Sequence, residues 1–189
     1  DKVSEKLNLD FIEEYSLCLE ENAMFAYDDK QIVATIKGVD DNYKNVTGID
    51  SMIVRGDYFL EYQNAFCGVS GQGIAYNLNL DVSFIYPVKV YIPSRTKKIS
   101  AGMIDAADNL NQSIVYNAGI FSIQQEYDTK YFIAPLSEVR RLLEYENEVS
   151  SIEIKIKKGE NIKTSLNKLT ESFGEDFIVQ DRNMQHEYA

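Results

Sequence analysis

The C-terminal third of the chain contains the stretch that decides the fold class, residues 152–174, which read IEIKIKKGENIKTSLNKLTESFG. Over 152–156 isoleucine alternates with charged residues, and this period of two predicts a strand with one buried face. Over 162–173 apolar residues recur at helical spacing, and Gly174 stands where helices commonly end in the left-handed conformation. The stretch therefore predicts a strand followed by a helix.

The residues on either side of this stretch continue the same alternation of elements. Residues 131–134 are apolar and predict a short strand, and Pro135 and Ser137 are typical of a helix start. The helix that follows carries its apolar residues on one side, and residues 177–179 predict a further strand. The order strand, helix, strand, helix, strand indicates βαβ units.

The N-terminal part of the chain also combines a helix with strands. Residues 10–14 are expected to be helical, whereas 18–27 and 31–39 predict two strands. Residues 28–30, two aspartates and a lysine, predict the turn that joins these strands. Both ends of the chain are thus α/β in character.

The middle of the chain differs from both ends, with short β-branched pieces and scattered glycines. It has one expected helix at 73–78 and one expected strand at 89–92. We therefore predict an α+β fold in which an outer α/β lobe, 1–45 and 114–189, is interrupted by a smaller β-rich lobe, 46–113. Because the insertion interrupts the outer lobe, both termini are expected to emerge from that lobe.

The polar interval 95–113 has no strong periodicity and is predicted to project from the inserted lobe. Long loops of this kind usually carry function or are disordered. Its basic residues form a small cluster in an acidic protein, and its apolar residues, if exposed, are contact points for a partner. The competing interpretation is a solvated loop whose apolar residues fold back onto the lobe. The candidate partner-binding residues are Arg95, Lys97, Lys98, Met103, Ile104 and Leu110.

The composition narrows the functional classes. The 189 residues carry a net charge of −11, which opposes binding to nucleic acid or to an anionic membrane surface. Hydrophobic residues make up 44% of the chain, which predicts a packed core. No apolar run approaches the roughly 20 residues that cross a bilayer. The chain begins with Asp1 rather than Met, and we expect it to be a fragment of a longer protein.

The sequence offers little for catalysis or metal binding. Cys18 and Cys67 lack the paired spacing of a zinc site and are expected to be buried thiols, with a disulfide as the alternative in an oxidising compartment. His186 is the one histidine. The strings at 94–97 (SRTK) and 71–73 (GQG) lack the partner motifs of penicillin-binding enzymes and of dinucleotide-binding loops. We therefore predict no enzymatic activity, no cofactor and no metal.

Four short blocks occur in the order found in one family of transporters: IKGVDDNY at 36–43, GQGIAYNLNL at 71–80, VYIPS at 90–94 and AGIFSIQQEYD at 118–128. In these blocks the chain resembles the extracytoplasmic domain of lipoprotein-releasing (LolC/LolE-type) ABC-transporter permeases. It is more distantly similar to MacB-like and FtsX-like permeases. The resemblance extends from about residue 20 to the end of the chain.

The resemblance implies a location, a set of partners and a mechanical role. The domain would lie on the periplasmic side of the bacterial inner membrane, between two transmembrane helices, with a porter-like outer lobe. A pair of permease subunits, driven by a cytoplasmic ATPase, would pass a lipoprotein to a periplasmic carrier. In one permease type a hook grips the carrier, and the corresponding interval here is 95–113. The familiar hook contains proline, whereas this interval contains none.

Two further hypotheses remain open at this point. The first is a MacB-like or FtsX-like permease domain that serves export or transmits motion to a partner outside the membrane. The second is an independent secreted hydrolase or binding protein that uses the interval 95–113 as a lid over its site.

Overall fold

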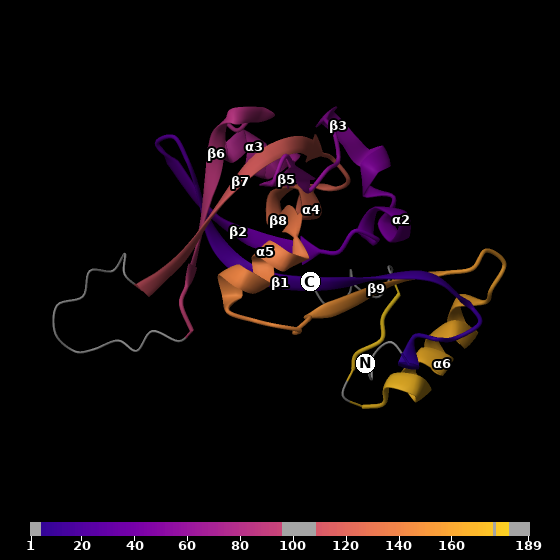
Figure 1. Cartoon of the computed structure of the whole chain (residues 1–189). Helices are drawn as coiled ribbons and strands as arrows, with labels where there is room; N and C mark the ends of the chain where they lie inside the picture. Colours follow the sequence, from indigo (N-terminus) through magenta and orange to yellow (C-terminus); the bar gives the residue numbers. More distant parts are fainter. Residues whose placement is uncertain (1–4, 96–108, 176, 182–189) are drawn as a thin grey trace. The chain divides into compact units, whose positions relative to one another are not determined.

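The computed structural model describes residues 5–95, 109–175 and 177–181. Strands supply most of the regular structure in these residues, and the helices are short (Figure 1). The mixture of strands and helices agrees with the predicted class. The elements are β1 Ile12–Tyr27, β2 Lys30–Val39, α2 Tyr43–Thr47, a 3-10 helix at Ile49–Met52, β3 Ile53–Gly56, β4 Glu61–Tyr62, β5 Ala65–Gly71, α3 Gln72–Leu78, β6 Ser83–Pro93, β7 Leu110–Phe121, α4 Gln125–Lys130, β8 Tyr131–Pro135, α5 Leu136–Leu143, β9 Ser151–Ile156 and α6 Ile162–Phe173.

The chain divides into two compact units. The smaller unit comprises Asp1–Tyr15 and Ile154–Ala189, and the larger unit comprises Ser16–Glu153. The polypeptide passes between them twice, within β1 and within β9. The predicted division into an outer lobe, 1–45 and 114–189, and an inserted lobe, 46–113, stays a prediction.

The larger unit is built on a mixed sheet. β2 pairs antiparallel with β1 and parallel with β8. β5 pairs antiparallel with β8 and parallel with β7, while β6 pairs antiparallel with both β7 and β1. The short strands β3 and β4 extend the sheet from β7 and β5. β2 is therefore an interior strand whose backbone is hydrogen-bonded on both sides.

The β1–β2 hairpin confirms the two strands predicted at 18–27 and 31–39. Its register runs from Cys18 opposite Val39 to Tyr27 opposite Lys30. Asp28, in the turn, has φ +53°, a left-handed conformation that aspartate tolerates better than most residues. The helix expected at 10–14 is wrong, because β1 already begins at Ile12. There β1 pairs with β9, a partner about 140 residues away that local propensity does not reveal.

Helix α5 packs its apolar side onto the sheet, as the pattern after Pro135 predicts. Val139, Leu142 and Leu143 are buried in the main hydrophobic core. The helix approaches β2 closely at Gly38, where an added Cβ would lie 2.6 Å from the Val139 Cβ. Gly38 is thus required by close packing between a helix and a strand.

The smaller unit contains α6, which confirms the helix predicted at 162–173. The Asn161 side chain caps its N-terminus by accepting a hydrogen bond from the Thr164 amide at 3.1 Å. Gly174 follows the helix with φ +76°, a backbone conformation that favours glycine. The strand predicted at 177–179 is wrong, because these residues have no strand structure.

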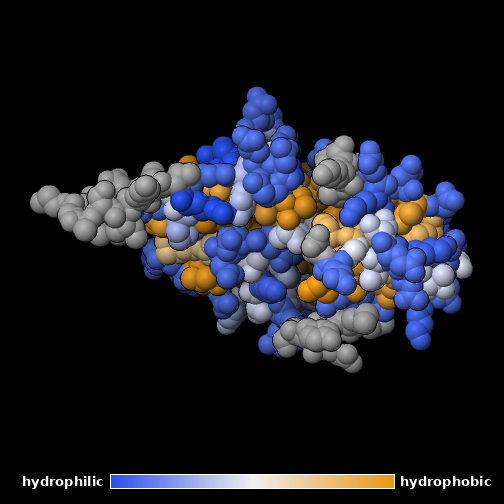
Figure 2. Space-filling view, turned by 90° about the horizontal axis from the view of Figure 1, so that it is seen from below, coloured by the Kyte–Doolittle hydropathy of each residue, from blue (hydrophilic) through white to orange (hydrophobic). Residues whose placement is uncertain are grey.

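Hydrophilic residues cover much of one face of the molecule, and hydrophobic residues form smaller separate areas on it (Figure 2). This surface is consistent with the net charge of −11. No helix in 5–95, 109–175 or 177–181 is long and apolar enough to span a bilayer.

Candidate functional site

The sequence-predicted site maps to the β6–β7 hairpin, whose strands lie side by side (Figure 1). Pro93 pairs with Leu110, and the Ser94 amide donates to the Asn109 carbonyl at 2.8 Å. Leu110 is the first residue of β7. The strand therefore begins earlier than predicted, because 110–113 belong to β7 and not to a loop.

Only two of the six predicted partner-binding residues fall in the described part of the chain. Arg95 and Leu110 both lie at the base of the hairpin, where β6 ends and β7 begins. The other four lie outside the described residues: Lys97, Lys98, Met103 and Ile104. The structure therefore describes the base of the predicted site.

The C-terminal end of α5 holds the β6 side of this base. The Glu144 carboxylate accepts hydrogen bonds from the Ser94 hydroxyl at 3.1 Å and from the Arg95 amide at 3.0 Å. The Arg95 guanidinium lies over the Tyr145 ring, 4.3 Å from its centroid, in cation–π geometry. Glu144 is the helix cap residue with φ +58°, so its side chain is placed by the way α5 ends.

A buried carboxylate holds the β7 side of the base. Glu138 of α5 is only 1% exposed and accepts a hydrogen bond from the Ser113 hydroxyl. Arg141 donates to both carboxylate oxygens of Glu138, with Nη2 2.6 Å from Oε1 and Nε 2.7 Å from Oε2. Its Nη2 also donates to the Gln112 carbonyl at 3.3 Å. The hydrogen bond to Glu138 raises the pKa of Arg141, so the guanidinium stays charged at neutral pH.

One more contact completes the attachment: the Asn111 side-chain amide donates to the Leu142 carbonyl at 2.9 Å. Three consecutive β7 residues, 111–113, thus contact the helix that also holds Ser94 and Arg95. Proline is absent from the interval 95–113, and the orientation of the hairpin base is set instead by α5. We call this set of contacts the α5 mount. The α5 mount was not predicted, because Glu138 and Arg141 look in the sequence like an ordinary solvent-exposed ion pair on a helix.

A second polar cluster surrounds Lys37 of the interior strand β2. Lys37 Nζ lies 2.9 Å from Glu20 Oε1 and 2.9 Å from Glu153 Oε1. The Tyr131 hydroxyl donates to the other oxygen of Glu20 at 3.1 Å. Burial opposes the ammonium charge, but nearby Tyr43, Glu153 and Glu20 raise the pKa of Lys37 well above its ordinary value. Lys37 therefore stays charged although it is buried.

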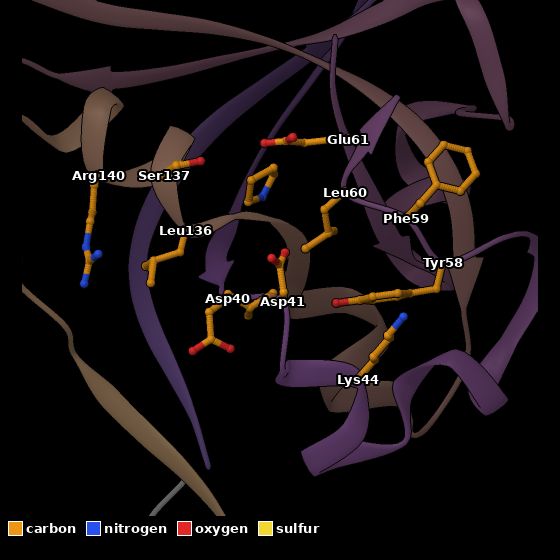
Figure 3. A pocket seen from close by; sticks show the side chains of 12 residues that line it. Asp40, Asp41, Lys44, Tyr58, Phe59, Leu60, Glu61, Leu136, Ser137 and Arg140 are labelled. Carbon is orange, nitrogen blue, oxygen red and sulfur yellow. The ribbon is translucent and has the colours of Figure 1, made fainter. Parts of the chain in front are cut away.

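A groove of about 540 Å³ opens beside the end of β2 (Figure 3). It contains side chains of both charges, including Asp41, Glu61 and Lys44, together with the Tyr58 hydroxyl. Burial raises the pKa of Tyr58, and its hydroxyl oxygen has no hydrogen-bond partner among the described residues. The groove is lined by neither cysteine nor histidine.

An aromatic cluster lies on the surface of the larger unit and was not anticipated from the sequence. Phe84 stacks with Phe59 at 5.7 Å and with Tyr116 at 6.2 Å between ring centroids, and Tyr62 completes the cluster. Ile85 follows Phe84 and is 78% exposed. The signal available in the sequence was the run of large apolar residues at 84–86, which breaks the alternation expected of β6.

No group of three or more His, Cys, Asp or Glu residues in the described part of the chain is placed to hold a metal ion. Cys18 and Cys67 are free, buried thiols, as predicted. Ser70 is fully buried in β5, and an added Cβ at Gly71 would lie 2.2 Å from the Asp128 carbonyl oxygen. The glycine thus permits packing against α4. His186 and Lys97 lie outside the described residues.

No protein-family model matches the sequence, and no curated protein matches it. Solved structures do match. The chain shares the fold of MacB's periplasmic region. The structure of that region from Actinobacillus actinomycetemcomitans has a TM-score of 0.61 at 14% identity, covering 98% of this chain and 79% of that one.

Two further solved structures support the same fold. The extracellular domain of the noncanonic ABC-type transporter YknZ from Gram-positive bacteria has a TM-score of 0.57 at 14% identity, over 95% of this chain and 87% of that one. A domain of a putative permease protein from Porphyromonas gingivalis has a TM-score of 0.51 at 11% identity, over 98% of this chain and 71% of that one. The predicted likeness to permease domains is confirmed at the level of the fold.

Proposed function

We propose that this chain is a non-catalytic extracytoplasmic domain of an ABC-type permease, which transmits ATP-driven motion from the membrane to a partner outside it. The observation that carries the proposal is the fold, which matches MacB's periplasmic region over 98% of this chain. The domain would lie on the periplasmic side of a bacterial inner membrane.

The mechanism needs a stiff body with a protruding contact point. The α5 mount supplies stiffness at the hairpin, because Glu138 and Glu144 tie both of its strands to one helix. A displacement of the domain then moves the hairpin with it. We propose that the interval 95–113 touches the partner through Arg95, Lys97, Lys98, Met103, Ile104 and Leu110.

The specific cargo that we propose is a lipoprotein, which is handed from the inner membrane to a periplasmic carrier. The partners are then a cytoplasmic ATPase subunit acting through the transmembrane part, a second permease subunit, the lipoprotein and the carrier. This proposal rests on the four sequence blocks that resemble lipoprotein-releasing permeases. Nucleic acid is not among the partners, because the net charge of −11 opposes it.

The second candidate is a MacB-like or FtsX-like permease domain that serves export or mechanotransmission. The specific observation in its favour is that MacB and YknZ supply the structural matches. The same mount and the same hairpin would then act on an adaptor or another extracytoplasmic partner. A secreted hydrolase or binding protein is the third candidate, and no feature of the described residues favours it.

Reconstitution of the full-length permease tests the proposal. The transporter, its ATPase and a radiolabelled lipoprotein are placed in proteoliposomes, and ATP-dependent transfer of the lipoprotein to soluble carrier is measured. We expect transfer that requires both ATP and the extracytoplasmic domain. ATP hydrolysis without lipoprotein transfer, in a transporter that exports another compound, would favour the second candidate. Hydrolytic activity of the 189-residue chain alone would refute the non-catalytic role.

A further inference from the structure

The two passages of the chain between its compact units are the starting point. One falls between Tyr15 and Ser16 in β1, and the other between Glu153 and Ile154 in β9. We call these positions the two crossings. On the larger unit's side, each crossing is held by a side chain from the last residues of β2 or from the residue that follows it.

Asp40, the residue directly after β2, holds the first crossing. Its Oδ1 accepts a hydrogen bond from the Ser16 hydroxyl at 2.7 Å, and its Oδ2 accepts one from the Leu17 amide at 2.8 Å. The Asn42 amide also donates to Oδ1, at 3.1 Å, and helps to fix the carboxylate. Ser16 is fully buried, so its hydroxyl is desolvated and depends on this partner.

Lys37, three residues earlier, holds the second crossing. Its ammonium lies 2.9 Å from the carboxylate of Glu153, the last residue of the larger unit before the chain leaves it. The same ammonium contacts Glu20 of β1 at 2.9 Å. The backbone adds a link, because the Ser150 amide donates to the Cys18 carbonyl at 2.9 Å. β9 is thereby attached to β1 and β2 just before the crossing.

The charges around Lys37 make this residue necessary for keeping β9 attached to β1 and β2. Lys37 is 7% exposed, and its charge is compensated by two carboxylates. Without Lys37, Glu20 and Glu153 face the same space with like charges, which repel each other. β9 stands outside the main strand order, and its one strand pairing among the described residues is with β1, so it depends on side-chain contacts more than the interior strand β2 does.

We propose that Lys37 and Asp40 form a two-point anchor that fastens both crossings to the interior strand β2. They are positioning residues: displacement of the chain beyond either crossing reaches the sheet through these contacts. This inference rests on the proposed function for its biological purpose. The anchor itself is a physical property of the chain and is tested without any transport assay.

Hydrogen exchange measured by mass spectrometry on the 189-residue chain tests the anchor. We expect Lys37→Met to raise the exchange rates of amides 150–153 about tenfold, because local opening of β9 becomes easier. Asp40→Asn should raise exchange at Leu17, whose amide loses its carboxylate acceptor. The two effects should be separate, with little change at the opposite crossing.

A matched control removes an exposed ion pair from the same unit. Arg55 lies 2.8 Å from Asp81, with both side chains more than half exposed, so Arg55→Met should leave both crossings unchanged. If Lys37→Met does not fold, Glu153→Ala keeps the pair between Lys37 and Glu20 and should still loosen β9. Exchange at 150–153 that matches the Arg55→Met rates in both variants would overturn the anchor.

The full-length transporter separates the anchor from the proposed function. A permease carrying Lys37→Met should retain basal ATP hydrolysis but lose most cargo transfer. Loosened crossings with unchanged cargo transfer would refute the role in transmission while the anchor stands. Unchanged exchange would refute the anchor and leave the permease assignment untouched.

Discussion

The guanidinium of Arg141 is held in a two-point contact by the carboxylate of Glu138, which is 1% exposed, at 2.6 and 2.7 Å. This contact joins neighbouring turns of α5 and at the same time fixes the partner of the Ser113 hydroxyl in β7. The pair is therefore the centre of the α5 mount. Bidentate geometry of this kind is the strong form of a charge-assisted hydrogen bond.

Removing Arg141 should destabilise the larger unit. Arg141→Met leaves the buried Glu138 charge without its ionic partner, and we expect a loss of about 2 kcal/mol in the free energy of unfolding at neutral pH. Urea unfolding followed by circular dichroism measures it. The double variant Glu138→Leu with Arg141→Met should lose less than Arg141→Met alone, because no buried charge remains. Equal stability of Arg141→Met and wild type would contradict the mount.

The contact between Glu144 and the hairpin should be visible as local protection. Glu144→Ala removes the acceptor of the Arg95 amide, so exchange at Arg95 should rise while the free energy of unfolding changes by less than about 1 kcal/mol. Glu146→Ala is the control, because Glu146 is exposed and its side chain is not part of the mount. If both variants exchange at the same rate at Arg95, Glu144 does not hold the hairpin.

Alkaline pH should weaken the fold through Cys18. Burial raises the pKa of its thiol from 9.0 to about 12. Between these values the unfolded chain has lost the thiol proton and the folded chain has kept it, so stability falls as pH rises from about 9. Urea unfolding at pH 8.5 and 9.5 measures the slope.

Cys18→Ala should show a shallower loss of stability than wild type over that interval. Burial also raises the pKa values of Tyr43 and Tyr58, but their ordinary value is 10.0, so they contribute mainly at higher pH. Identical slopes for Cys18→Ala and wild type would show that the thiol does not titrate as described. Wild-type Cys18 should also resist alkylation by iodoacetamide until the chain is unfolded.

Charge reversal at the predicted contact surface should weaken partner binding. Replacing Arg95, Lys97 and Lys98 by Glu is expected to lower the affinity of the full-length permease for its periplasmic carrier at least about tenfold. Surface plasmon resonance at two salt concentrations measures the affinity and its electrostatic part. Unchanged carrier affinity would remove these residues from the site.

A matched variant excludes an effect of net charge alone. Replacing Lys30, Lys158 and Lys163 by Glu changes the charge by the same amount at exposed positions that are not part of the hairpin. This variant should bind the carrier like wild type. Equal weakening by both triple variants would show a non-specific charge effect.

Gly71 should not tolerate a side chain. An added Cβ would lie 2.2 Å from the Asp128 carbonyl oxygen, which belongs to backbone and has little freedom to move. We expect Gly71→Ala to cost about 2 kcal/mol or more of unfolding free energy, measured by urea unfolding. Gln72→Ala, at the exposed first position of α3, should cost less than about 1 kcal/mol. Comparable stability of the two variants would argue against the packing role.

Elements with a local apolar pattern could be predicted from the order of residues alone. The patterns at 152–156 and 162–173 predicted β9 and α6, and the pattern after Pro135 predicted α5. The prediction that both cysteines are buried thiols is also confirmed. Periodicity succeeds there because one face of a helix or strand must be buried whatever covers it.

Features that depend on partners far away in the chain became visible only in the folded protein. Local pattern suggested a helix at 10–14, but pairing with β9 extends β1 back to Ile12. Glu138 and Lys37 look like surface charges in the sequence, yet both are buried. In the folded protein Glu138 contacts Ser113 and Arg141. Lys37 contacts Glu20 and Glu153. Such charges are buried only where a partner compensates the loss of water, and a partner 116 residues away leaves no mark in the local sequence.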